Sequence, residues 1–160
     1  MLPYRDLVAL KNRNVIGLGV QLSSVMRPTR QLTLYATANY GKGIGSMTGD
    51  LIMGNYDLVA VPEKSGTLYA PKSFGWFGAV QYQFMHNLYA SATFGDLRYL
   101  PEHPVYPTEY KYGLYSAYNV FWNITPRIQV AGELNLGKRQ NMNGEHRWAR
   151  RISLMTQFSF

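Results

Sequence analysis

The sequence has no cysteine among its 160 residues, and only 16% of them are Asp, Glu, Lys or Arg. Without cysteine, a disulfide scaffold and a thiolate metal site are excluded. The charged fraction is well below the roughly 25% that is typical of soluble domains, which argues against an ordinary water-facing surface. A disordered chain is excluded as well, because 14% of the residues are aromatic and would collapse out of water. At this length we expect one folded domain, residues 1–160.

Long apolar runs are also missing. A membrane-spanning helix needs about 20 mostly apolar residues. The longest stretch without a charged residue, 73–95, is interrupted by Gln81, Gln83, His86 and Asn87. The first ten residues lack the apolar core of a secretory signal, so we expect a cytosolic protein, a mature protein or a fragment.

Apolar and polar residues alternate along most of the chain. Between Arg127 and Gly137 the even positions are aliphatic or glycine, and the odd positions are polar or small. Successive side chains of a strand point to opposite faces, so this pattern predicts a strand with one apolar face. The same pattern predicts eight strands in total: 4–10 (the weakest), 16–26, 32–40, 74–84, 88–95, 111–122, 127–137 and 151–160.

Strand and loop lengths indicate a membrane barrel. Most of the predicted strands are longer than the 5–6 residues common in soluble sheets and match the ~9–11 residues that cross a bilayer. Short turns at 27–30, 85–87 and 123–126 alternate with long connections at 43–72, 100–109 and 138–147. That asymmetry is typical of outer-membrane proteins. We therefore expect an all-β fold, an antiparallel transmembrane up-and-down β-barrel.

The apolar face carries aromatic residues at both ends of the predicted strands, as a lipid-facing surface does. Even-numbered residues should therefore contact lipid, and odd-numbered residues should line the interior. Leu134→Arg should block folding into bilayers, whereas Asn135→Arg should fold normally. The alternative is a soluble lipocalin-like barrel or sandwich with one buried face. The aromatic residues are Tyr40, Phe74, Trp76, Phe94 and Tyr112 toward the long loops, and Phe84, Trp122, Phe158 and Phe160 toward the short turns.

The segment 151–160, which ends in Phe160, resembles the C-terminal strand by which outer-membrane barrels are recognised for insertion. Several short motifs resemble one family, the DcaP-like porins of Gram-negative outer membranes. The motifs are YRDL at 4–7, GVQLS at 19–23, YGKGIG at 40–45, DL at 50–51, DLV at 57–59, FWN at 121–123, PR at 126–127 and GKR at 137–139. The resemblance covers the whole chain but only the C-terminal part of the family barrel. It implies a larger, trimeric barrel for small and often anionic solutes. The alternative is a small closed eight-stranded barrel that acts as an anchor or adhesin without a pore.

No catalytic motif stands out. The three histidines, at 86, 103 and 146, lie in separate turns or loops, and neither HExxH nor GxSxG occurs. His146 with Glu145 and Ser153 is the one set that combines a base with a nucleophile, and solvated loop residues explain it better. We therefore expect no enzyme activity, no cofactor and no metal. Nucleic acid is not an expected partner either, because the basic residues do not interleave with aromatics on one strand face.

The net charge of +7 gathers toward the C-terminus. By parity, five charged residues fall on the predicted interior face. Basic residues that line a pore raise the local concentration of anions, so these residues predict anion preference. For Arg147 and Arg150 the alternative is contact with anionic lipid or with solvent near a loop. The predicted pore-lining residues are Lys111, Glu133, Arg139, Arg147 and Arg151.

Two local features need an explanation. The connection 43–72 is long and mildly apolar, so we expect it to fold into the pore mouth as a constriction or to pack between protomers. Within it, Asp50 to Asn55 has the length of one helical turn. Asp96 and Arg98 fall on the predicted lipid face, so we expect a β-bulge there or an exit of the chain above the membrane.

Overall fold

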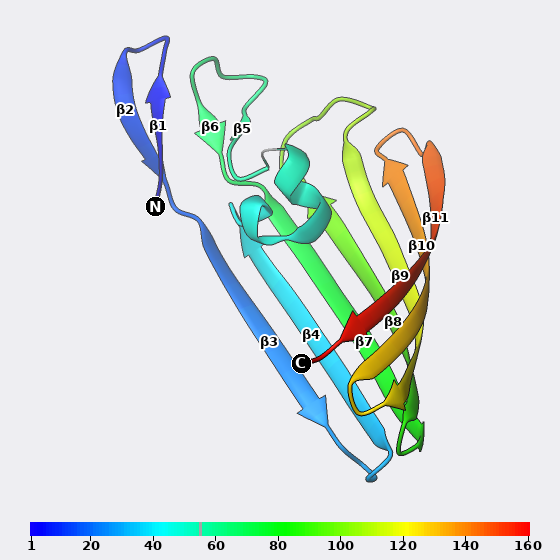
Figure 1. The fold of residues 1–160 in the computed structure, drawn as a ribbon. Helices are drawn as coiled ribbons and strands as arrows, with labels where there is room; N and C mark the ends of the chain where they lie inside the picture. Colours follow the sequence, from blue (N-terminus) through cyan, green and yellow to red (C-terminus); the bar gives the residue numbers. More distant parts are fainter. Residues whose placement is uncertain (55) are drawn as a thin grey trace.

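The computed structural model describes residues 1–54 and 56–160 and is built around one antiparallel sheet of seven long strands (Figure 1). The order across the sheet is β11-β10-β9-β8-β7-β4-β3, so each strand lies beside its neighbour in the chain. The sheet curves strongly, and within the described residues its two edges, β3 and β11, are not paired with each other. The strands are β3 (Leu18–Met26), β4 (Leu32–Lys42), β7 (Lys72–Met85), β8 (Leu88–Leu100), β9 (Tyr110–Thr125), β10 (Ile128–Asn141) and β11 (His146–Phe158).

The register keeps even-numbered residues on one face of the sheet and odd-numbered residues on the other. Leu134 pairs with Tyr118 on one side and Ile152 on the other. Tyr118 pairs with Ala92, and the same row continues to Val80. A slip of one residue would exchange the two faces, so this register confirms the division into faces that the alternation predicts.

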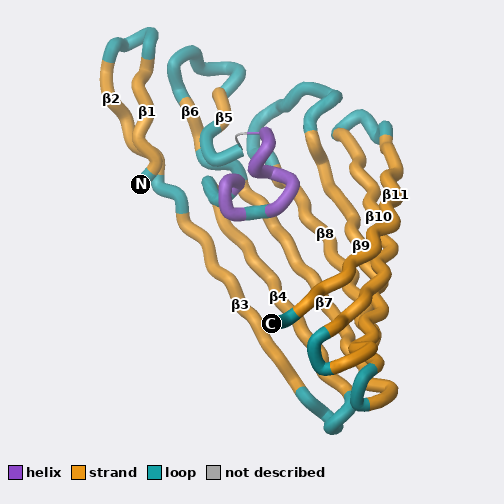
Figure 2. Tube along the Cα trace, in the orientation of Figure 1, coloured by secondary structure: helices purple, strands orange, loops and turns teal. Residues whose placement is uncertain are grey.

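Short turns lie at one end of the sheet and long connections at the other (Figure 2). The two-residue turns 86–87 and 126–127 join β7 to β8 and β9 to β10. Residues 43–71 and 101–109 form the longest connections at the opposite end. The predicted asymmetry is confirmed. Within the described residues, no helix is long and apolar enough to span a membrane.

The segment 4–10 is not a strand of the main sheet, contrary to the prediction. It contributes to a separate hairpin of β1 (Leu2–Asp6) and β2 (Lys11–Val15). Asp6 ends β1 by accepting the backbone N–H groups of Val8 and Ala9, both at 2.9 Å. These bonds fold residues 7–10 into a turn, and they are the chief reason that the pKa of Asp6 is lowered. The alternation around Tyr4 therefore stops at a side-chain-capped turn.

The long connection 43–71 folds against the odd face of the sheet. It contains the 3₁₀ helices η1 (Gly45–Met47) and η2 (Gly49–Gly54) and the short hairpin of β5 (Val59–Ala60) and β6 (Leu68–Tyr69). Leu51 is 1% exposed and packs in a cluster with Tyr99 and Tyr110. Figure 1 shows these helices within the curve of the sheet. The predicted helical turn is confirmed over 50–54, and Asn55 lies outside the described residues.

The β-bulge expected near Asp96 is absent from the described pairing. Asp96 pairs with Trp76 and Leu114, and Arg98 pairs with Phe74 and Tyr112, without interruption. Both charges therefore remain on the even face. Arg98 Nε lies 2.6 Å from a carboxylate oxygen of Asp96, so the two residues neutralise each other in place. The register shifts instead between Gln83 and Met85, Ile128 and Gln129, and Gln140 and Asn141.

Candidate functional site

The odd face of the sheet is lined by hydrogen-bonded polar side chains. Asn119 donates to Ser91 at 3.3 Å, and Gln129 donates to Asn123 at 2.7 Å. Closer to the long-loop end of the same face, the hydroxyl of Tyr115 donates to Asn135 at 2.7 Å. These side chains come from three neighbouring strands, β8, β9 and β10. A face this polar suits contact with water.

Four of the five predicted pore-lining residues lie on this odd face. Arg151 pairs with Glu133 at 3.3 Å, so these two charges largely compensate each other. Arg139 and Arg147 are direct partners in the register of β10 and β11, near the long-loop end. The guanidinium of Arg139 also lies over the ring of Tyr110, 5.5 Å from its centroid. Among the residues that the structure describes, 1–54 and 56–160, Arg139 and Arg147 have no ion pair with a carboxylate, so their positive charge remains at the long-loop end of this face.

The face of the fifth residue, Lys111, stays a prediction. The register shift between Gln140 and Asn141 leaves Lys111 without a partner in β10, because Tyr112 pairs with Gln140 and Tyr110 pairs with Asn141. Tyr110 is 2% exposed and packs against Leu51, whereas Lys111 is exposed. The bulge adds one residue to β9, and beyond it Tyr110, an even-numbered residue, pairs with the odd-numbered Asn141.

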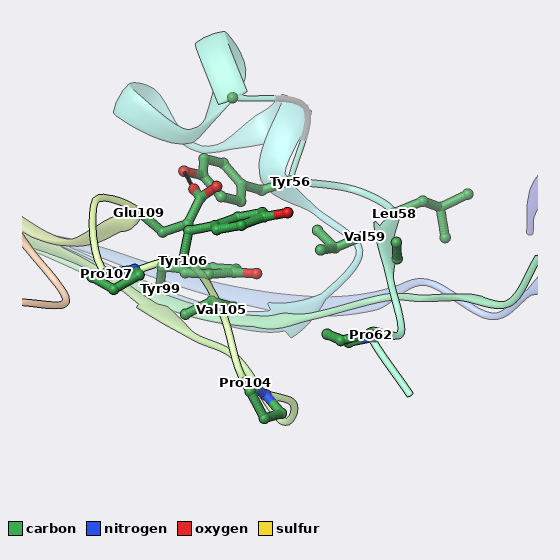
Figure 3. Close-up of a pocket in the computed structure, with 12 residues that line it drawn as sticks. Tyr56, Leu58, Val59, Pro62, Tyr99, Pro104, Val105, Tyr106, Pro107 and Glu109 are labelled. Carbon is green, nitrogen blue, oxygen red and sulfur yellow. Dashed lines mark hydrogen bonds between the residues drawn. The ribbon is translucent and has the colours of Figure 1, made fainter. Parts of the chain in front are cut away.

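A cavity of about 580 Å³ opens where the long connection meets residues 99–109 (Figure 3). Tyr56, Tyr99 and Tyr106 gather at one end of it, beside Glu109. The hydroxyl of Tyr56 donates to Glu109 at 2.6 Å, and the ring centroids of Tyr56 and Tyr99 are 4.6 Å apart. Burial, followed by the bond to Glu109, raises the pKa of Tyr56 to about 12. This hydrogen bond joins the two longest connections above the odd face.

Sequence reasoning missed this cavity. The available signal was the density of proline and aromatic residues in 99–107, which reads YLPEHPVYP. Such residues make stiff, apolar loop surfaces. Their partner, Tyr56, lies in a different connection, and no local pattern indicates that the two connections meet.

Away from the charged residues near its long-loop end, the even face is largely apolar and exposed. Leu22 and Ile152 are each 78% exposed, and Leu154 is 87% exposed. Trp122 and Tyr112 mark the two ends of this face in β9. They are ten residues apart, which is about 34 Å along a strand and about 25 Å across a membrane at a tilt of about 40°. That height matches the apolar band of an outer-membrane barrel.

The one set of residues that combines a base with a nucleophile is not assembled. His146 pairs with Gln140 on the even face, whereas Ser153 pairs with Glu133 on the odd face. The two residues are seven positions apart in β11, which is about 24 Å. No group of three or more His, Asp or Glu side chains within the described part of the chain is placed to hold a metal ion.

Comparison with known proteins supports the fold. No protein-family model matches the sequence, and no curated protein matches it. Among solved structures, the chain is similar to the crystal structure of the outer membrane channel DcaP of Acinetobacter baumannii, with a TM-score of 0.81 and 17% sequence identity. The match covers 99% of this chain and 44% of that chain. The chain therefore has the fold of part of an outer-membrane channel barrel, and the resemblance to DcaP-like porins is confirmed at the level of the fold.

Proposed function

We propose that the chain is part of an outer-membrane porin that lets small, preferentially anionic solutes diffuse through its lumen. The observation that carries the proposal is the division of one long-stranded sheet into an exposed apolar face and a hydrogen-bonded polar face. A soluble sheet would bury its apolar face, because exposed apolar patches beyond a few hundred Å² are rare on soluble monomers. In a membrane barrel, the apolar even face would contact lipid and the polar odd face would contact water.

The proposed barrel is larger than this chain and contains it as the C-terminal part. In a bilayer every backbone N–H and C=O needs a partner, so the edges β3 and β11 must be paired. Further strands would pair them, in keeping with a chain that matches 44% of the DcaP channel. We place the barrel in the outer membrane of a Gram-negative bacterium, as a homotrimer, with outer-membrane lipid around it.

Anion preference is assigned to Arg139 and Arg147. They are adjacent across two strands and lie at the long-loop end, where a solute enters from that side. Arg151 contributes less, because Glu133 lies 3.3 Å from it. The folded connection above them, held by Leu51, narrows the entrance. No reaction and no cofactor is part of this function.

The test is the reversal potential of the protein in planar bilayers under a gradient of KCl. We expect an anion-selective current. The double variant Arg139→Gln/Arg147→Gln should move the reversal potential toward zero, and Arg151→Gln alone should move it less. The matched control, Arg27→Gln/Arg30→Gln, removes the same charge from the short turn after β3 and should leave selectivity unchanged.

Two outcomes would overturn the proposal. A folded, heat-modifiable barrel without conductance would favour the anchor or adhesin without a pore. Equal effects of the two double variants would show that net charge, rather than the lumen arginines, sets selectivity.

A further inference from the structure

A cluster of cations and aromatic rings lies on the even face, away from the odd face on which Arg139 and Arg147 lie. We name Arg98, Tyr112, Lys138 and Trp148 the outer cation cluster. The guanidinium of Arg98 lies 5.9 Å from the centroid of the Tyr112 ring, and Lys138 Nζ lies 5.7 Å from it. Lys138 Nζ also lies 5.6 Å from the Trp148 ring and donates to the Tyr112 hydroxyl at 3.4 Å. The rings therefore hold both cations in place.

The register fixes the height of this cluster on the sheet. Arg98 and Tyr112 share a row with Phe74, and Lys138 and Trp148 occupy the next row toward the short turns. These rows form the aromatic end of the even face, next to the long connections. Below them the even face is largely apolar, and Arg150 is the charged residue of the next row. In a bilayer the cluster would therefore lie at the boundary between lipid headgroups and acyl chains.

The cluster has more positive than negative charge. Asp96 is the carboxylate on this part of the even face, and it pairs with Nε of Arg98. Within residues 1–54 and 56–160, Lys138 has no ion pair with a carboxylate. Arg150 lies one row below, on the same face, and is exposed. An unpaired cation facing lipid is costly unless an anion meets it.

We propose that the outer cation cluster binds the phosphate group of a lipid in the leaflet at the long-loop end. This inference rests on the membrane insertion that the proposed function includes. Phosphate oxygens accept charge-assisted hydrogen bonds from both guanidinium and ammonium groups. The strands of Arg98 and Lys138 are two apart, about 10 Å, so both long side chains reach one headgroup.

A lipid fits this cluster better than a free phosphate solute does. The cluster is on the face opposite the proposed lumen, where solutes do not pass. The row below it carries Phe94 and Leu136 on the even face, and Leu114 lies beside Lys138 in the lower row of the cluster. These apolar side chains suit acyl chains. A ligand that places a phosphate group on the cations and an apolar chain on the neighbouring apolar residues is an amphiphile, as a lipid is.

The experiment measures lipid binding to the full chain folded in detergent micelles, by native mass spectrometry. The probes are lipid A, which carries phosphate groups, and phosphatidylcholine as a zwitterionic comparison. We expect preference for lipid A, and a Kd about 30-fold weaker in Arg98→Gln/Lys138→Gln, because each basic residue near anionic lipid contributes about fivefold. Lys138→Arg should keep the binding. Arg139→Gln/Arg147→Gln removes the same charge from the odd face and should also keep it.

Four results would overturn the inference. Unchanged binding in Arg98→Gln/Lys138→Gln would exclude the cluster, and equal loss in the odd-face variant would show unspecific charge attraction. Competition by inorganic phosphate at the affinity of lipid A would identify a solute site. A change in oligomeric state without loss of lipid would identify a contact between copies. Conductance is the separate readout: a conducting protein without lipid A preference refutes this inference alone, and a protein that does not insert refutes both.

Discussion

Ile152→Arg separates a membrane sheet from a soluble one more sharply than any other substitution on the even face. Ile152 is 78% exposed and pairs with Leu134, so an arginine there disturbs little packing within the protein. In water the change should be almost neutral, because surface substitutions usually stay within about 0.5 kcal/mol. In a bilayer the arginine would face hydrocarbon.

The expected penalty follows from the height of Ile152 on the sheet. Its row contains Tyr118, which is four residues from Trp122 and six from Tyr112. At about 2.6 Å of height per residue, Ile152 lies about 10 Å above one aromatic end and about 16 Å below the other. It is therefore within about 3 Å of the midplane, where arginine costs about 2–4 kcal/mol. The folding equilibrium should weaken about 30- to 1,000-fold.

The assay is refolding into liposomes, with the folded fraction read from heat-modifiable gel mobility and stability read from denaturant titration. Ser153→Arg is the matched control, because Ser153 is the next residue, faces the odd side and pairs with Glu133. An arginine there would lie opposite Glu133, which already pairs with Arg151, on the polar face that we propose is in water. Equal stability of the two variants in liposomes would refute the assignment of lipid to the even face.

Asn135 is a poorer control than the sequence suggests. The predicted neutrality of Asn135→Arg assumes an open position on the odd face. In the structure Asn135 is 7% exposed, accepts a hydrogen bond from Tyr115 and donates one to Glu133. Arg151 is its partner in β11, so an arginine there would face a like charge and leave Tyr115 unpaired.

Two further predictions concern the folded connection. Leu51→Ala should weaken the packing of the connection 43–71 against Tyr99 and Tyr110 by about 2–5 kcal/mol and raise single-channel conductance. Ile52→Ala, at a position that is 55% exposed, is the control and should leave the conductance unchanged. Equal conductance of the two variants would contradict this prediction. The pKa of Tyr56, about 12, lies above the ordinary tyrosine value of about 10. The hydrogen bond to Glu109 should therefore persist up to about pH 10 and be lost as the pH rises toward 12. Ultraviolet difference spectra of wild type against Tyr56→Phe should show this late titration, and a midpoint near pH 10 would argue against the bond.

Most of the sheet could be predicted from the sequence, because its information is local. Alternation between Arg127 and Gly137 requires a strand, and the two-residue turn before Ile128 requires an antiparallel partner. The predictions failed where a single side chain or bulge overrides the pattern. Asp6 caps a turn and removes the segment 4–10 from the sheet, and a bulge at the long-loop end of β9 interrupts the alternation, so that Tyr110 pairs with Asn141.

The candidate site could be predicted from the sequence less completely than the sheet could. Parity alone places Glu133, Arg139, Arg147 and Arg151 on one face, but it does not show which charges compensate each other. That depends on rotamers, as in the pairing of Arg151 with Glu133. The contact of Tyr56 with Glu109 joins residues 53 positions apart, and no periodicity encodes such a contact.

The order of strands has a consequence for how the sheet assembles. Because most neighbours in the sheet are joined by short connections, most of it can form by adding one hairpin at a time, which keeps contacts local and folding fast. The pairing of β4 with β7 differs, because it closes the connection 43–71. Closing 29 residues instead of two costs about 2 kcal/mol more in chain entropy. The β5–β6 hairpin and the buried Leu51 reduce the length of free chain in that connection. The segment that we propose as a constriction of the pore would therefore also lower the entropic cost of pairing β4 with β7.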